Sequence, residues 1–353
     1  MLGRPLENHW INITDGRVES VSLKPAYPPQ YLGDHSIILP AAINAHAHLE
    51  LSQIEAPLDV PSRSMSDWVA ALLAFRRSAD YNADEGIRQA LGRPELLEST
   101  IAVADIAPRE SSGQPGGLRP PLLRSYAELI AWRSEQIEEN IPHTFGLSPH
   151  APHTVCPALL EKAINQNVPI AMHLAETPEE LQLLRHHTGP LLEMMRRADP
   201  DYDPKSVLLG KRPMDYLQLL SAAPSVLIIH GNYLDDEELR FLAAHRETMS
   251  VVYCPRSHAY FRHTSYPLQK MLDYGVRVLL GTDSLASVPN LNLVEEMQFA
   301  LQQHPMVSPE VVYRLGTLEG AKALNLPEGF GTIQPGSPAR FAKIKMEHHR
   351  FFK

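Results

Sequence analysis

The stretch Asn44-Ala45-His46-Ala47-His48-Leu49-Glu50 follows the apolar run Ile37–Ile43 and places two imidazoles two residues apart. In an extended strand, side chains at positions i and i+2 project to the same face. His46 and His48 can therefore reach one metal ion together. Two histidines can also meet by accident in a strand, so the interpretation depends on the rest of the chain.

Seven further short apolar runs follow this one, and amphipathic helical stretches separate them. The runs are Thr100–Ala107, Leu122–Tyr126, Thr144–Ser148, Val168–Met172, Ser225–Ile229, Met249–Tyr253 and Val276–Leu280. Eight strand-like runs that alternate with helices predict an α/β fold in which a parallel sheet closes into a (β/α)8 barrel.

Both ends of the chain carry signals of a smaller β element. Residues 10–22 alternate apolar and polar around Asp15-Gly16, a dipeptide that favours a tight hairpin. Residues Phe330–Gly336 also read as strand and turn, so we expect the two ends to pair into a minor sheet. Residues 108–121 are rich in Gly, Pro and Ser and predict a flexible loop at the mouth of the barrel.

Composition limits the possible functions. The chain has 353 residues, 44% hydrophobic content and a formal net charge of -9. It has no basic tract, which argues against a nucleic acid or an anionic membrane as partner and favours a small neutral or cationic substrate. Cys156 and Cys254 are far apart, so neither a disulfide framework nor a thiolate zinc site is indicated. We expect a cytoplasmic protein with no export signal and no membrane insertion.

Polar residues that can do chemistry stand where the apolar runs stop. A polar residue has to end any strand, but this does not explain why four of the eight runs end at histidine. The carboxyl ends of barrel strands converge on one face, so these residues should meet there. They are His46 and His48, Asp105, His150, His173, His230 and Asp283.

His173 is followed three residues later by Glu176, and Asp283 follows the last run. If His173 binds the metal, Glu176 lies close enough to carry protons without binding it. Asp283 can bind the ion and accept the proton of an attacking water. His230 can bind a second metal or orient that water, or it can be a buried structural histidine. A solvent-exposed Glu at a helix start is the alternative for Glu176.

The motifs together resemble the amidohydrolase superfamily, in particular its single-metal deaminase branch with the chlorohydrolases nearby. The resemblance covers nearly the whole chain, and the motifs occur in the family's order: Asn-Ala-His-Ala-His, His-Leu-Ala-Glu, Ile-His-Gly-Asn, Tyr-Cys-Pro-Arg-Ser and Leu-Gly-Thr-Asp-Ser-Leu-Ala-Ser. It implies a distorted (β/α)8 barrel over residues 39–326, with a small β-sandwich from residues 1–38 and 327–353.

The resemblance also implies the roles of individual residues. One Zn²⁺ or Fe²⁺ would be held by His46, His48, His173 and Asp283, while Glu176 shuttles protons and His230 assists the water. Substrate contacts are expected from His150, His153, Glu50, Glu128 and His258. His153 stands where relatives often carry Tyr. Binuclear members need a lysine near the fourth strand end, but here the first lysine after His150 is Lys162 in a helix, which favours one metal.

The function that this resemblance implies is hydrolytic deamination of an aminated heterocycle, of the purine base or nucleoside class, by metal-activated water. Deaminases of aminodeoxyfutalosine are most similar in their motifs, and those of methylthioadenosine or adenosylhomocysteine follow closely. Dechlorination of a ring and hydrolysis of a cyclic amide use the same kind of site and remain alternatives. A non-catalytic metal-binding barrel is a further alternative. Association into a homo-oligomer is also open.

Overall fold

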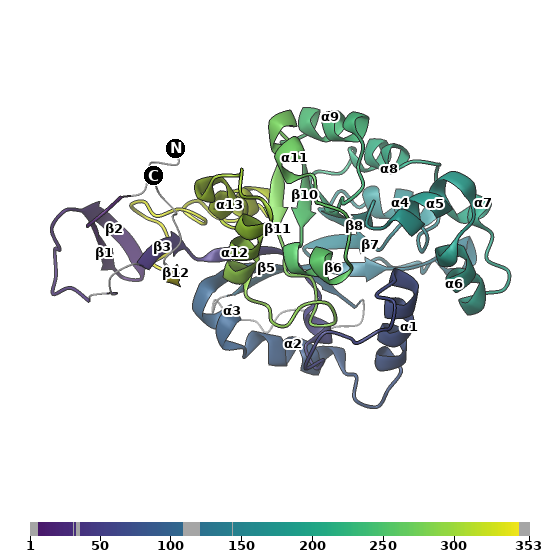
Figure 1. Cartoon of the computed structure of the whole chain (residues 1–353), viewed down its shortest axis with the longest axis horizontal. Coiled ribbons are helices and arrows are strands. Elements are labelled where there is room, and N and C mark those ends of the chain that lie inside the picture. The colour runs from purple at the N-terminus through teal and green to yellow at the C-terminus, as the bar shows by residue number, and fades with distance from the viewer. Residues whose placement is uncertain (1–5, 31, 33–35, 109–120, 143, 346–353) are drawn as a thin grey trace.

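The computed structural model describes residues 6–30, 32, 36–108, 121–142 and 144–345. Eight parallel strands lie side by side in chain order, and helices surround them (Figure 1). The barrel strands are β4 (Ala42–Ala47), β5 (Thr100–Ala107), β6 (Leu122–Leu129), β7 (Gly146–Pro149), β8 (Ile170–Leu174), β9 (Val226–His230), β10 (Met249–Tyr253) and β11 (Val278–Leu280).

The sheet closes where its first and last strands meet. A single parallel bridge joins Ala47 to Asp283. Nearby, Nδ2 of Asn44 donates to Oγ1 of Thr282 at 2.8 Å, and the Thr282 amide donates to Oδ1 of Asn44 at 3.1 Å. The side chain of Asn44 thus bridges the seam, together with backbone hydrogen bonds from the Thr282 and Asp283 amides to the His46 carbonyl, both of 3.1 Å. The predicted distorted (β/α)8 barrel is confirmed.

The prediction that residues 37–43 form a single strand is wrong, because these residues belong to two strands. Residues Ser36–Pro40 form β3, which pairs antiparallel with β12 (Phe341–Lys345) outside the barrel. The barrel strand β4 begins only at Ala42 and therefore includes His46. The chain leaves one sheet and enters the other within a single unbroken apolar run, which hydrophobicity alone cannot divide.

The small sheets at the termini agree with the expected fold class. The hairpin is β1 (Trp10–Thr14) and β2 (Arg17–Ser22), and it extends away from the barrel in Figure 1. The predicted strand at 330–336 is wrong: this segment forms turns, and the C-terminal strand is β12. Gly336 instead donates a backbone hydrogen bond to Val18 at 2.8 Å. The domain boundaries stay a prediction, and residues 109–120 of the expected loop lie outside the described residues.

The helices follow the strands, and two of them begin at the caps that their sequences indicate. Thr177 accepts from the Glu180 amide at the start of α5, and Asp235 accepts from the Glu237 and Glu238 amides at the start of α9. The acidic run at 235–238 is therefore a helix start. The helices are α1 (Met65–Arg76), α2 (Ala83–Leu91), α3 (Pro94–Ser99), α4 (Pro157–Ile164), α5 (Pro178–His186), α6 (Pro190–Ala198), α7 (Pro204–Val207), α8 (Pro213–Leu220), α9 (Asp236–Ala244), α10 (Pro255–Tyr260), α11 (Leu268–Tyr274), α12 (Leu293–Gln303), α13 (Pro309–Leu315) and α14 (Leu318–Ala323), with short 3-10 turns at Leu49–Leu51 and Ser134–Gln136.

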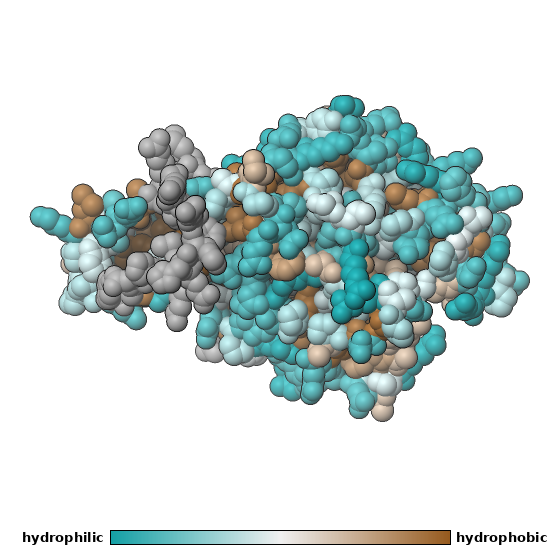
Figure 2. Space-filling model, in the orientation of Figure 1, coloured by the Kyte–Doolittle hydropathy of each residue, from teal (hydrophilic) through white to brown (hydrophobic). Residues whose placement is uncertain are grey.

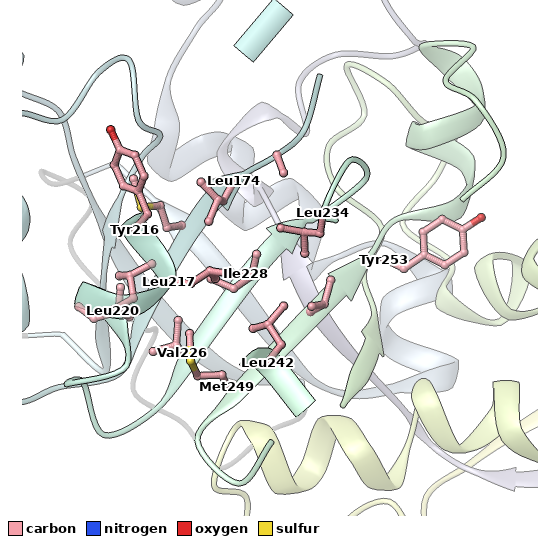
Figure 3. Packing of buried hydrophobic residues seen from close by; sticks show 14 of the residues in the cluster. Leu174, Tyr216, Leu217, Leu220, Val226, Ile228, Leu234, Leu242, Met249 and Tyr253 are labelled. Carbon is pink, nitrogen blue, oxygen red and sulfur yellow. The ribbon is translucent and has the colours of Figure 1, made fainter. Parts of the chain in front are cut away.

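The main core fills the layer between the barrel and its helices. Figure 3 shows Ile228 of β9 packed near Leu217 of α8, with Leu242 of α9 on the neighbouring side. All three side chains are buried. The face shown in Figure 2 is mostly hydrophilic. Among the described residues no helix is both long and apolar enough to cross a membrane.

Candidate metal and active site

Four histidines and one aspartate meet at the carboxyl ends of the barrel strands. His46 lies in β4, His173 in β8 and His230 at the end of β9, while His48 and Asp283 follow β4 and β11. Nitrogen atoms of His46, His173 and His230 lie within 4.8 Å of one another, and so do donor atoms of His46, His48 and Asp283. All five residues are buried. Because His46 belongs to both groups, the five side chains surround one small volume.

The histidines fit a metal ion because their ring nitrogens lack other partners. Both ring nitrogens of His46 are buried without a hydrogen bond, and so is Nδ1 of His48. Burying unpaired polar atoms is costly, so this donor set calls for an ion or a water molecule. Nδ1 of His173 donates to the His150 carbonyl at 3.1 Å, which leaves its Nε2 as a lone-pair donor. Imidazole and carboxylate donors in this number suit a single divalent metal, as the sequence predicts.

Asp283 is held so that one carboxylate oxygen faces the histidines. Its Oδ1 lies 3.6 Å from Nε2 of His46 and 3.9 Å from Nε2 of His48. Its Oδ2 accepts hydrogen bonds from Ser257 at 2.7 Å and from Ser287 at 3.4 Å. Burial alone would raise the pKa of Asp283, but the surrounding histidines hold it well below its usual range. The residue is therefore a carboxylate anion in the folded protein.

The backbone turns sharply at two of these residues. His230 has a φ of 68° and Asp283 a φ of 66°, in the left-handed region that few residues other than glycine adopt. Such conformations cost free energy and concentrate at functional sites. Here they occur at two strand ends whose side chains both belong to the cluster.

Glu176 lies beside the cluster, as expected for a proton carrier. Its Oε1 is 3.3 Å from Nε2 of His230. Burial raises the pKa of Glu176 well above its ordinary value, and the nearby carboxylate of Asp283 raises it further. The backbone amides of Ala175 and Glu176 both donate to the carboxylate of Glu180, at 2.8 and 3.1 Å. Glu180 thus fixes the turn from which Glu176 projects.

The predicted substrate contacts lie at different distances from the cluster. The ring centroid of His150 is 5.1 Å from that of His173, and His153 follows at 6.0 Å from His150. His150 also shares a hydrogen bond of 2.8 Å with Thr154. His258 contacts the ring of His263, with centroids 5.2 Å apart. The structure therefore groups His150 and His153 on one side and His258 on another.

Glu50 and Glu128 contact one arginine that the sequence reasoning missed. Arg76 of α1 pairs with Glu50 at 2.5 Å and lies 3.8 Å from Glu128. Burial raises the pKa of both carboxyl groups, and Arg76 opposes that rise. Arg76 carries no motif, and the only sequence signal for it is that two buried acidic residues need a counter-charge.

Asp105 has a structural role at its strand end. Its Oδ1 accepts a hydrogen bond of 2.9 Å from the Leu49 amide, next to His48 in the chain.

A separate cavity of about 320 Å³ lies at the end of β6, and its lining includes Glu128, Ile137 and Leu159. The cluster residues do not line it.

The comparisons with known proteins agree with this geometry. Residues 37–349 of the chain match the Amidohydrolase family. The chain is 29% identical to the 5-methylthioadenosine/S-adenosylhomocysteine deaminase of Pyrococcus furiosus over 95% of this chain and 81% of that protein. It is 27% identical to the aminodeoxyfutalosine deaminase of Deinococcus radiodurans over 82% of this chain and 73% of that protein.

A solved structure supports the fold independently. The aminofutalosine deaminase of Helicobacter pylori, in complex with methylthio-coformycin, superimposes with a TM-score of 0.76 at 20% identity, and the match covers 97% of this chain and 88% of that one. At this identity the match concerns the fold alone. The family match, which extends over the whole barrel, confirms the resemblance seen in the motifs: this chain belongs to the amidohydrolase family.

Proposed function

We propose that the chain is a metal-dependent hydrolase that deaminates a purine nucleoside and releases ammonia. The observation that carries the proposal is the pairing of a buried donor cluster with Glu176, 3.3 Å from His230, whose carboxyl group has a raised pKa. A purely structural metal site has no need of such a proton carrier. The relatives that act on methylthioadenosine, adenosylhomocysteine and aminodeoxyfutalosine support the same substrate class.

We assign one metal ion, Zn²⁺ or Fe²⁺, to His46, His48, His173 and Asp283, which come from two donor groups that share His46. When bound, such an ion lowers the pKa of a coordinated water toward neutrality. The carboxylate of Asp283 is ionised and its Oδ1 faces the cluster, so it would accept a proton there. His230 lies in the same group of donors as His46 and orients the water.

Glu176 carries the proton to the substrate. A carboxyl group with a raised pKa keeps its proton to a higher pH than an ordinary Glu does, and it can donate that proton to a ring nitrogen as water adds to the carbon that bears the amine. The proton that Asp283 has accepted then passes to the amino group, the C–N bond breaks and ammonia leaves. The hydroxyl left on the ring becomes a carbonyl, and its proton returns to Glu176. Substrate contacts are proposed for His150, His153, Glu50 and Glu128. The ring of His150 lies beside that of His173, with centroids 5.1 Å apart.

The cellular setting is also a proposal. Both cysteines, Cys156 and Cys254, are buried and free, which agrees with a reducing cytoplasm. A small molecule is the proposed substrate, and a homo-oligomer remains open.

Product analysis tests the function. The metal-loaded protein is incubated with aminodeoxyfutalosine, methylthioadenosine, adenosylhomocysteine, adenosine, guanine and cytosine, and with a chlorinated triazine and a cyclic amide. Ammonia, chloride and new carboxylate are then measured. We expect ammonia from at least one nucleoside. Chloride or carboxylate without ammonia would replace deamination with one of the two other hydrolytic reactions.

A further inference from the structure

The asparagine of the Ile-His-Gly-Asn segment has no role in the proposed chemistry, yet it is buried beside the residues that do. Asn232 follows β9, two residues after His230, and only 8% of its surface is exposed. Its Nδ2 donates a hydrogen bond of 2.8 Å to the backbone carbonyl of Glu176. One buried side chain therefore joins the segment that carries His230 to the residue whose carboxyl group lies next to that histidine.

The segments that follow β8 and β9 stay paired beyond the ends of these strands. Two backbone hydrogen bonds of 3.1 Å join them, from the Gly231 amide to the Leu174 carbonyl and from the Tyr233 amide to the Ala175 carbonyl. Backbone groups make both bonds, so neither bond depends on which side chains stand there. The bond from Asn232 to Glu176 does depend on the side chain, because its donor is the side-chain amide. It is also the bond that reaches the proposed proton carrier.

The turn that presents Glu176 is held on both sides. Ala175, just before it, has a φ of 54°, in the left-handed region that a residue with a side chain seldom adopts. Such a conformation persists only where its surroundings fix it. The carboxylate of Glu180 accepts a hydrogen bond of 3.1 Å from the Glu176 amide, and Asn232 donates to the Glu176 carbonyl. Glu180 ties the turn to its own helix, α5, whereas Asn232 ties it to the segment of His230.

His230 is held independently of the Asn232 side chain. It belongs to β9, and the Tyr266 hydroxyl donates a hydrogen bond of 3.0 Å to its carbonyl. Oε1 of Glu176 lies 3.3 Å from Nε2 of His230, and a backbone shift of about 1 Å at Glu176 would be enough to spoil this geometry. Loss of the Asn232 amide should therefore displace Glu176 and leave His230 in place.

We propose that Asn232 is a positioning residue, which sets the place of the Glu176 carboxyl group relative to His230 by holding the Glu176 backbone. The inference rests on the proposed deamination, in which Glu176 carries the proton, and it adds the residue that keeps Glu176 in register with the neighbouring strand end. A side chain that acts in this way changes turnover through Glu176, whereas substrate binding and metal content stay as they are.

A double-mutant cycle tests whether Asn232 acts through Glu176. Ammonia release from methylthioadenosine, or from whichever nucleoside proves active, is measured for the wild type, Asn232→Ala, Glu176→Gln and the variant that combines both changes. Asn232→Asp has the same shape without the donor, so it removes the hydrogen bond without leaving a cavity. Asn165→Ala, at the exposed end of α4, is the matched control. Bound metal is measured in every sample.

Asn232→Ala and Asn232→Asp should each lower kcat roughly 10-fold to 100-fold, the scale of a small misplacement of a reacting group, with KM and metal content as in the wild type. In the Glu176→Gln background, Asn232→Ala should cost less than about 3-fold, because the group that it positions is already disabled. An equal loss in both backgrounds, an unchanged kcat in both single variants, or a loss of bound metal would overturn the inference. Absence of ammonia from every nucleoside with the wild type would instead refute the proposed function.

Discussion

The hydroxyl of Ser257 donates a hydrogen bond of 2.7 Å to Oδ2 of Asp283, and this contact decides which carboxylate oxygen faces the histidines. Ser257 is buried at the start of α10. The preceding residue, Arg256, fastens that helix to α12 through an ion pair of 2.6 Å with Glu296. The position of a candidate metal ligand therefore depends on a contact between two helices outside the barrel.

Removal of the Ser257 hydroxyl should weaken metal binding. In Ser257→Ala, Oδ2 loses its closest donor and Asp283 is free to rotate, so we expect a loss of about 10-fold to 100-fold in metal affinity. Competition titration with a chromogenic chelator measures this directly. Ser257→Thr retains the hydroxyl and should bind almost as the wild type does. Ser206→Ala, at an exposed position of α7, is the control. Equal affinities in all four proteins would show that the contact does not position Asp283.

Glu176→Gln should separate proton transfer from metal binding. Glutamine has nearly the same shape but cannot give up a proton, so kcat should fall by roughly 10²-fold to 10⁴-fold. Metal content, measured by elemental analysis, should stay that of the wild type because Glu176 is not in the donor groups. Glu179→Gln changes a neighbouring carboxylate on α5 and should keep most of the activity. Near-normal turnover of Glu176→Gln would contradict its role.

Arg76→Met should destabilise the fold. The substitution leaves Glu50 fully buried without its counter-charge, and breaking a buried pair in this way costs about 3–5 kcal/mol. Urea denaturation gives the free energy of unfolding. Arg77→Met removes an exposed charge at the next position and should change it by less than about 0.5 kcal/mol. If both variants lose the same amount, the contact with Glu50 does not stabilise the protein.

His153 should make the metal-free protein sensitive to acid. Burial lowers its pKa to about 4 in the folded state, whereas the unfolded chain titrates near its ordinary value of 6.5. Between these values the unfolded state binds more protons, so the contribution of His153 to stability is lost as pH falls from 6.5 to 4. His153→Phe should therefore lose up to about 3 kcal/mol less than the wild type when the pH is lowered from 7 to 4.

Urea denaturation of the metal-free proteins at both pH values checks this difference. His186→Phe places the same substitution on an exposed helix end. Parallel stability curves for the wild type and His153→Phe would mean that His153 is not held neutral in the folded state.

The barrel and most of its cluster could be predicted because their signals are local. Each strand is a short apolar run, and each chemical side chain stands at its end, as with His173 in β8 and His230 in β9. The boundary between β3 and β4 could not be predicted, since residues 37–43 are apolar throughout and only pairing with β12 separates them.

The supporting contacts could not be predicted because they join segments far apart in the chain. Arg76 meets Glu50 and Glu128 only through the path of α1 over the barrel end. Ser257 meets Asp283 only because β10 and β11 are neighbours. His263 carries no spacing signal toward His258, and the two rings meet only through tertiary packing. Sequence patterns identify residues that end strands, and tertiary packing selects their partners.

The most direct test of the proposed deamination measures ammonia release from methylthioadenosine and from aminodeoxyfutalosine. Three samples are compared: the metal-free wild type, the wild type reconstituted with one equivalent of Zn²⁺, and the Glu176→Gln variant reconstituted in the same way. We predict ammonia only from the reconstituted wild type, with metal bound equally by the variant. Ammonia release from the metal-free protein, or none from the reconstituted wild type with these or any other aminated nucleoside, would contradict the claim that this cluster catalyses deamination.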